Sequence, residues 1–226
     1  MRLSLRLGRL LTAVMGAAFL AGGCSGSVES IVGFRVESLD PGVVQAGDTD
    51  VAWTVRGAGF DPAATVTVTA PGVSIANVVI VSDQEITFEL TALNTVAAGT
   101  ASVAVMNPDG QSRGLNVPTL PENVTLSGLV QPIFDANCVG CHSGGAPAGG
   151  LNLSTGVTHG AVVDVPSTGV PTMDLIDPGN AETSYLLEKV VGTATVGAIM
   201  PPNAAPLSAT DIALIVAWVE AGALDD

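Results

Sequence analysis

The first half of the chain alternates apolar and polar residues with period two. Residues 51–55 read Val-Ala-Trp-Thr-Val, and residues 86–90 read Ile-Thr-Phe-Glu-Leu. β-Branched and aromatic residues at this spacing predict half-buried β-strands. Turn residues such as Asp40-Pro41-Gly42 and Asn107-Pro108-Asp109-Gly110 recur between these stretches. Several short strands with such turns predict an antiparallel β-sandwich of about 90 residues.

From residue 124 onward the spacing of apolar residues becomes helical. A one-sided stripe at i, i+3, i+4, i+7 and i+8 consists of Leu126, Leu129, Val130, Ile133 and Phe134. Pro132 is expected to kink or restart this helix. A second helix is predicted over 181–191, between Asn180 and Gly192. A third begins at Ser208, which forms a capping-box pattern with Asp211, and Gly222 ends it.

The two patterns meet at the proline-marked stretch 118–123, Pro-Thr-Leu-Pro-Glu-Asn. We therefore predict a multidomain chain, with an all-β sandwich over residues 30–118, a linker over 119–123 and an all-α domain over 124–226.

The N-terminus has the features of an export signal. Arg2, Arg6 and Arg9 precede an apolar run from residue 10 to 20, and Ala21-Gly22-Gly23-Cys24 follows. A charged region, a short apolar region and small residues before a cysteine resemble a bacterial lipoprotein signal. This resemblance implies a signal peptide over 1–23, lipid attachment at Cys24 and a tether over 24–29. The alternative is an ordinary signal peptide that leaves Cys24 free.

Removal of that signal leaves a strongly acidic protein. The signal contains three of the seven basic residues and no acidic one, so four basic residues face 21 acidic ones, a net charge of −17. Such a field repels nucleic acid and favours partners with basic docking surfaces. A merely solubilising acidic surface is the other interpretation.

Cys138-Val139-Gly140-Cys141-His142 carries the candidate chemistry. The pattern C-x-x-C-H is that of c-type haem attachment, in which two thiols bind the porphyrin and the imidazole binds the iron. A thioredoxin-like redox pair is one alternative, although no βαβ context surrounds Cys138. Half of a zinc site is another, and it needs two further ligands.

An iron held by His142 needs a sixth ligand. Met200 is our candidate, because two prolines follow it in Met200-Pro201-Pro202 and stiffen its loop. Met173 has no comparable stiffening, and His159 is the alternative axial ligand.

Two family resemblances extend these predictions. Gly57-Ala58-Gly59-Phe60, the strand-like stretch 101–105 and the Asn107-Pro108-Asp109-Gly110-Gln111 turn resemble the IPT/TIG family. That resemblance spans about residues 30–118 and implies an immunoglobulin-like fold that serves as a spacer or a protein-binding module.

The stretch Val130-Gln131-Pro132-Ile133-Phe134 before C-x-x-C-H, then Asp177-Pro178-Gly179-Asn180 and Met200-Pro201-Pro202, resembles class I cytochromes c. More narrowly, residues 124–226 resemble planctomycete-type cytochrome c domains. The resemblance implies an all-α class I fold with one covalent haem, His142 proximal and Met200 distal. It also implies that a carbonyl beside a proline orients the imidazole, for which 144–147 is the candidate stretch.

The resulting expectation is an anchored monohaem electron carrier that exchanges electrons with redox partner proteins. We expect it in the periplasm or at the cell surface, and Ser25, where an inner-membrane retention signal has aspartate, favours the outer membrane. Two alternatives remain open: a peroxidase-like haem enzyme, and a surface adhesion protein in which the haem domain is accessory.

Overall fold

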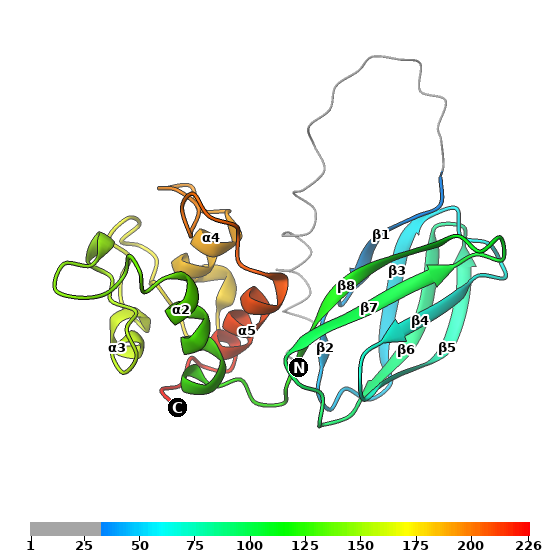
Figure 1. Cartoon of the computed structure of the whole chain (residues 1–226), viewed down its shortest axis with the longest axis horizontal. Helices are drawn as coiled ribbons and strands as arrows, with labels where there is room; N and C mark the ends of the chain where they lie inside the picture. Colours follow the sequence, from blue (N-terminus) through cyan, green and yellow to red (C-terminus); the bar gives the residue numbers. More distant parts are fainter. Residues whose placement is uncertain (1–32) are drawn as a thin grey trace, which may run out of the picture. The chain divides into compact units, whose positions relative to one another are not determined.

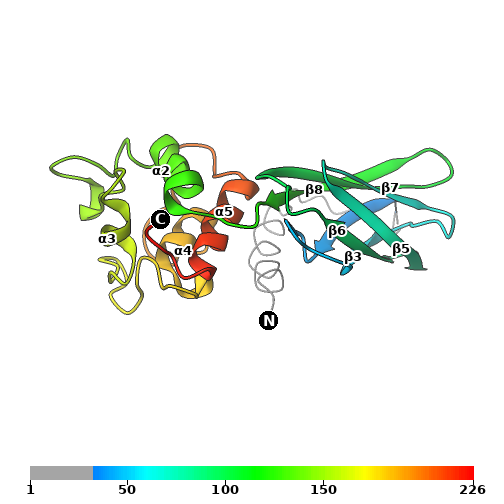
Figure 2. The ribbon, with the colours of Figure 1, turned by 90° about the horizontal axis from the view of Figure 1, so that it is seen from below.

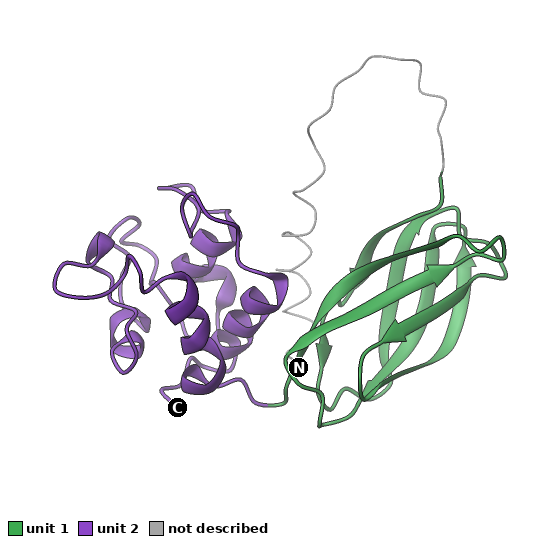
Figure 3. Cartoon of the chain, viewed as in Figure 1, with its two compact units in different colours: residues 1–122 green, residues 123–226 purple. Residues whose placement is uncertain are grey.

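The computed structural model describes residues 33–226, and the predicted signal peptide and Cys24 lie outside the described residues. The chain divides into two compact units, Met1–Glu122 and Asn123–Asp226, shown in two colours in Figure 3. Within the described part, no helix has the length and apolar character needed to cross a membrane.

The first unit contains eight strands among its described residues (Figure 1). They are β1 (Arg35–Asp40), β2 (Val44–Gln45), β3 (Val51–Ala58), β4 (Thr65–Thr69), β5 (Val73–Ser82), β6 (Glu85–Ala92), β7 (Gly99–Met106) and β8 (Ser112–Leu120). One sheet has the order β1-β3-β6-β5 and the other β2-β8-β7-β4. All neighbours pair antiparallel except β2 and β8, which are parallel.

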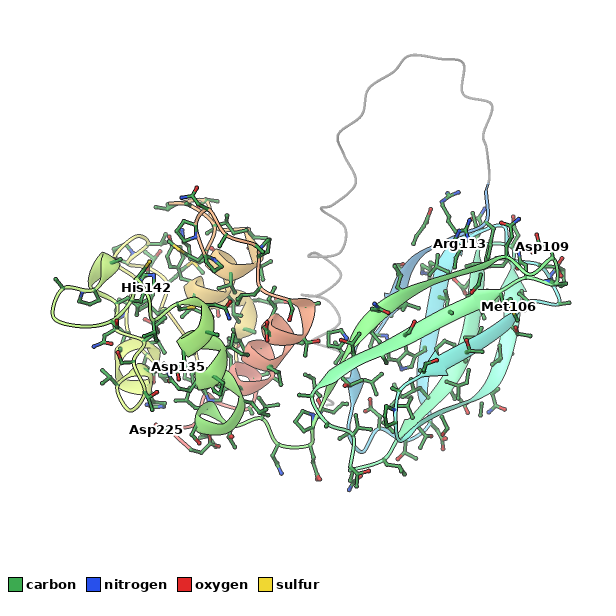
Figure 4. The ribbon with its side chains drawn as sticks, viewed as in Figure 1. Met106, Asp109, Arg113, Asp135, His142 and Asp225 are labelled. Atoms are coloured by element: carbon green, nitrogen blue, oxygen red, sulfur yellow. The ribbon has the colours of Figure 1, made fainter. Side chains whose placement is uncertain are left out.

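The alternating residues of the strands form the core of this unit. Trp53 pairs with Phe88 across β3 and β6, and their rings stack with centroids 5.9 Å apart. Val103 and Val105 of β7, in the other sheet, belong to the same buried cluster. Figure 4 labels Met106, Asp109 and Arg113 at the β7–β8 hairpin, where these three side chains are exposed and lie outside the core.

Close packing accounts for the glycine at position 57 in the Gly-Ala-Gly-Phe stretch. A side-chain carbon at Gly57 would meet the carbonyl oxygen of Arg35 on β1 and the ring of Phe60. Gly59 has φ +71°, a left-handed conformation that glycine adopts without strain. The two glycines therefore allow β1 and the Phe60 ring to approach β3 closely.

The second unit consists of short helical segments joined by long irregular loops. The segments are η1 (Leu126–Val130), α2 (Gln131–Asn137), η2 (Ala148–Gly150), α3 (Thr158–Val162), η3 (Ala181–Thr183), α4 (Tyr185–Val191) and α5 (Ala209–Glu220). Isolated bridges join Val163 to Ile176 and Pro166 to Asp174. α5 lies beside η1 and α4 (Figures 1 and 2).

These features contradict the predicted fold class. We expected an immunoglobulin-like sandwich followed by an all-α class I cytochrome c fold, but the structure is mostly β-sheet and only 22% helical. No all-α fold is present in the described chain. The physical reason is that glycine and proline interrupt residues 143–180, which therefore form mainly turns and loops, with only the short segments η2 and α3 helical.

The helix-end signals at Pro132, Ser208 and Gly192 are confirmed. The helix predicted over 181–191 is instead divided into η3 and α4, and the Asn180 side chain makes no capping hydrogen bond. Pro132 stands in the first turn of α2, where π-helical η1 gives way to a new α-helix. The Ser208 hydroxyl accepts a hydrogen bond from the Asp211 amide, as a capping residue does. Gly192 ends α4 in a left-handed conformation.

The middle of α5 is buried around its whole circumference, from Ile212 to Val219. The indole Nε1 of Trp218 donates to the carbonyl of Leu224, 2.9 Å away. Asp226, from the same C-terminal segment, accepts hydrogen bonds from the Leu126 and Ser127 amides at the start of η1. α5 and the residues after it thus anchor the helix that leads to the cysteines.

Candidate haem-binding site

The C-x-x-C-H stretch forms a tight turn directly after α2. Phe134, whose side chain is fully buried, fixes the end of α2 in the core, and its carbonyl accepts the Cys138 amide at 2.8 Å. The carbonyl of Cys138 in turn accepts the amides of Cys141 at 3.1 Å and of His142 at 2.9 Å. The turn therefore places both cysteines and His142 on one hydrogen-bonded segment. Figure 4 labels His142 in this region and Asp135 on α2.

The His142 imidazole is oriented by the loop that follows it. Its Nδ1 lies 3.0 Å from the carbonyl oxygen of Ala148. Because a carbonyl only accepts hydrogen bonds, Nδ1 must carry the proton and donate it. A neutral imidazole protonated on Nδ1 has its lone pair on Nε2, the nitrogen that is then available to a metal.

Two backbone hydrogen bonds hold the loop from residue 142 to 153. The Ala148 amide donates to the Cys141 carbonyl at 3.0 Å, and the Leu153 amide donates to the His142 carbonyl at 2.8 Å. Ala148 follows Pro147 directly, so the orienting carbonyl lies one residue beyond the predicted stretch 144–147. This carbonyl stands beside a proline, as the resemblance implied, but the sequence did not indicate which residue carries it, because a backbone acceptor has no side-chain signature.

A buried glutamine is hydrogen-bonded to the end of this loop. Gln131 is 4% exposed, and its amide donates to the Leu153 carbonyl at 2.9 Å and to Asp135 at 2.8 Å. Its Oε1 accepts the hydroxyl of Thr158, a residue of α3, at 2.6 Å. Gln131 thus joins α2, the end of the loop after His142 and α3. No sequence pattern indicates this role, since Gln131 stands beside Pro132 in an otherwise ordinary helix start.

We expect Gln131→Leu to lower the stability of the second unit by about 3 kcal/mol, because it leaves the Leu153 carbonyl and the Thr158 hydroxyl without their buried partner. Chemical denaturation followed by tryptophan fluorescence and circular dichroism measures this loss. The control is Asn137→Ala, since exposed Asn137 on the same helix makes one hydrogen bond to the Ile133 carbonyl. Equal stability of the two variants would contradict the role assigned to Gln131.

The two cysteines differ in their surroundings. Cys141 is exposed, whereas Cys138 is partly buried. Burial, with a smaller contribution from neighbouring Cys141, raises the pKa of the Cys138 thiol to about 11. The Cys138 thiol therefore stays protonated at neutral pH.

In protein expressed without haem maturation, we expect iodoacetamide to alkylate Cys141 well before Cys138 at pH 8. Only the thiolate reacts, and a pKa raised from 9.0 to about 11 lowers the thiolate fraction of Cys138 about 100-fold. Peptide mass spectrometry over a time course measures both rates, and the same experiment in denaturant is the control. Comparable rates in the folded protein would contradict this expectation.

Met200 comes from a different segment, the loop between α4 and α5. Its amide donates to the carbonyl of Lys189 on α4 at 2.8 Å, and its side chain is partly exposed. The alternative ligand His159 lies in α3, where its Nε2 donates to the Ala223 carbonyl at 2.9 Å. One nitrogen of His159 is thus already used in holding the C-terminal segment.

The donor set fits a c-type haem. Two thiols lie three residues apart on one turn, and the adjacent imidazole has the tautomer that leaves Nε2 for iron. Among the described residues, no group of three or more His, Cys, Asp or Glu side chains is arranged to hold a metal ion.

Comparison with known families supports a cytochrome c-type domain. Residues 138–204 match the family model described as Planctomycete cytochrome C, a stretch that begins at Cys138 and includes Met200. This match indicates haem binding. It does not extend to residues 30–118, so the IPT/TIG resemblance stays a prediction. No curated protein matches the chain.

Solved structures with similarity to parts of the chain are distant. The gamma-CGTase of alkalophilic Bacillus clarkii is 22% identical over 38% of this chain and 12% of its own, with a TM-score of 0.25. The ZirS C-terminal domain is 10% identical over 45% of this chain and 87% of its own, with a TM-score of 0.27. The Bacteroides ovatus GH5 xyloglucanase is 14% identical over 36% and 17%, with a TM-score of 0.26. The chain thus spans a small part of the two enzymes.

Proposed function

We propose that this protein is an exported, lipid-anchored monohaem c-type cytochrome that carries single electrons in the bacterial cell envelope. The observation that carries the proposal is the His142 Nδ1 to Ala148 hydrogen bond on a turn that also presents Cys138 and Cys141. The family match over 138–204 supports the cytochrome c part of the proposal independently of this geometry.

Each residue has a distinct role in this proposal. Cys138 and Cys141 hold the porphyrin through thioethers, which keep it in place when the chain fluctuates. His142 binds the iron through Nε2, and the Ala148 carbonyl fixes the plane and the protonation of the ring. Met200 supplies a thioether, a soft ligand that favours the ferrous state and raises the reduction potential.

A bound haem supplies an iron that changes oxidation state by one electron. If His142 and Met200 both bound the iron, no ligand position would remain for a small-molecule substrate, and this favours electron transfer over the peroxidase-like alternative. The chain's own contribution is to hold both ligands through the change of oxidation state.

The charge of the second unit indicates the kind of redox partner. From Asn123 onward Lys189 is its sole basic side chain apart from the histidines, and ten residues are acidic. Lys189 itself is held against the Val196 carbonyl and the Tyr185 ring. We therefore propose partners with basic docking surfaces, whose approach this acidic field accelerates at low ionic strength.

Expression of the full chain with a cytochrome c maturation system tests the proposal. We expect a protein whose denatured mass exceeds that of the processed polypeptide by its lipid and one haem. Its reduced-minus-oxidised spectrum should be that of a low-spin c-type cytochrome. A matured protein that loses all haem on denaturation would overturn the proposal, and a high-spin ferric spectrum with ready cyanide binding would favour the haem enzyme.

A further inference from the structure

The loop that carries Met200 is fastened to α4 at two points. At one point the Val196 carbonyl accepts the Tyr185 hydroxyl at 2.8 Å and the Lys189 ammonium at 3.2 Å. At the other the Met200 amide donates to the Lys189 carbonyl at 2.8 Å. Lys189 therefore bonds the loop with its side chain before Met200 and with its backbone at Met200.

The α4 residues involved are themselves well placed. Tyr185 is 7% exposed, so its ring is fixed in the core of the unit. Lys189 lies one helical turn further along α4, and its ammonium is 5.8 Å from the centre of the Tyr185 ring. This cation–π contact holds the lysine over the tyrosine, where both side chains reach the same carbonyl.

Two glycines with left-handed backbone conformations shape the loop after α4. Gly197 has φ +73°, and a side-chain carbon there would stand 2.8 Å from the Lys189 ammonium. Gly192 has φ +86°, and a side-chain carbon there would stand 2.7 Å from the Ile199 side chain. Both positions have a left-handed backbone, which glycine adopts without strain, so the two glycines favour the observed path of residues 192–200.

We propose that Tyr185 and Lys189 are positioning residues that hold the Met200 loop closed and so keep the thioether on the iron. The inference rests on the proposed function, because it assumes Met200 as a ligand. It goes further by naming the contacts that determine the fraction of molecules in which the Met200 thioether is bound to the iron. Neither side chain acts on the iron directly; both act through the Val196 carbonyl.

Imidazole binding to the ferric matured protein tests this inference. Imidazole takes the ligand position only in molecules whose thioether is detached, so its apparent affinity reports the detached fraction. We expect about fivefold tighter imidazole binding in Tyr185→Phe, which removes one hydrogen bond from a buried hydroxyl. For Lys189→Leu, whose bond is exposed, we expect about two- to threefold.

Hydrogen exchange of residues 192–200 provides a second readout. We expect faster exchange in both variants, and Lys189→Arg, which keeps a cationic donor, should restore both readouts. The control is Arg113→Leu, which removes a positive charge from the first unit and should leave both unchanged. Unchanged imidazole affinity in Tyr185→Phe and Lys189→Leu, with or without faster exchange, would overturn the inference while leaving the proposed function intact. A wild-type protein without methionine ligation would overturn both.

Discussion

The double variant Cys138→Ala, Cys141→Ala is expected to retain no haem after denaturation, whereas Cys24→Ala is expected to retain one. Of the three cysteines of the chain, Cys24 is predicted to carry lipid and the other two are predicted to carry haem. The structure places Cys138 and Cys141 on the same turn beside His142. Without either thiol no thioether forms, so denaturation releases any haem that His142 and Met200 still bind. Intact-protein mass spectrometry in denaturant measures this.

The same pair of variants separates haem attachment from membrane anchoring. We expect Cys24→Ala to leave the membrane fraction while keeping its haem, because lipid attachment is predicted at Cys24 alone. We expect the double variant to remain in the membrane fraction without haem. Covalent haem in the double variant would contradict the assignment of the C-x-x-C-H turn, and membrane retention of Cys24→Ala would contradict the lipoprotein prediction.

Met200→Ala is expected to lower the reduction potential by on the order of 100 mV or more, within the roughly 0.8 V that axial ligands span. Loss of the thioether removes the ligand that favours ferrous iron and opens one axial position. The far-red sulfur-to-iron band should disappear, and carbon monoxide should bind the reduced protein readily. Spectroelectrochemistry and carbon monoxide titration measure these changes.

Two matched variants test the choice of Met200. Met173→Ala is the control for losing a methionine, and it should keep both the band and the potential. His159→Ala tests the alternative axial ligand, whose Nε2 hydrogen bonds to Ala223 in the structure. We expect this variant to lose stability without a change in the spectrum. A Met200→Ala protein with the wild-type spectrum would contradict methionine ligation.

Sequence patterns predicted local structure well in two kinds of place. Strands over 51–58 and 85–92 follow the period-two alternation, because one face of each strand packs in a core. The start of α5 follows from the hydrogen bond between the Ser208 hydroxyl and the Asp211 amide, two residues that lie three positions apart in the sequence. Such features depend on neighbouring residues alone, so the sequence carries them directly.

The all-α class of the second unit was predicted wrongly because the fold of a whole unit does not depend on neighbouring residues alone. The apolar stripes at 126–134 and 212–219 are helical, and extending their character over the whole unit gave an all-α fold. Between them, residues 143–180 form loops, the short helical segments η2 and α3, and isolated bridges. Helices at the ends of a unit do not determine the loops between them, which are held by contacts such as Leu153 to His142.

The sequence by itself determined which atoms are available for chemistry: two thiols and an imidazole at a fixed spacing, and a methionine followed by two prolines. The tertiary structure decided how they are held, through the Ala148 carbonyl on His142, Gln131 beneath the loop, and Tyr185 with Lys189 on the Met200 loop. The physical reason is that covalent spacing is a property of the chain, whereas the partner of a carbonyl or an amide depends on which distant segments folding brings within 3 Å or so.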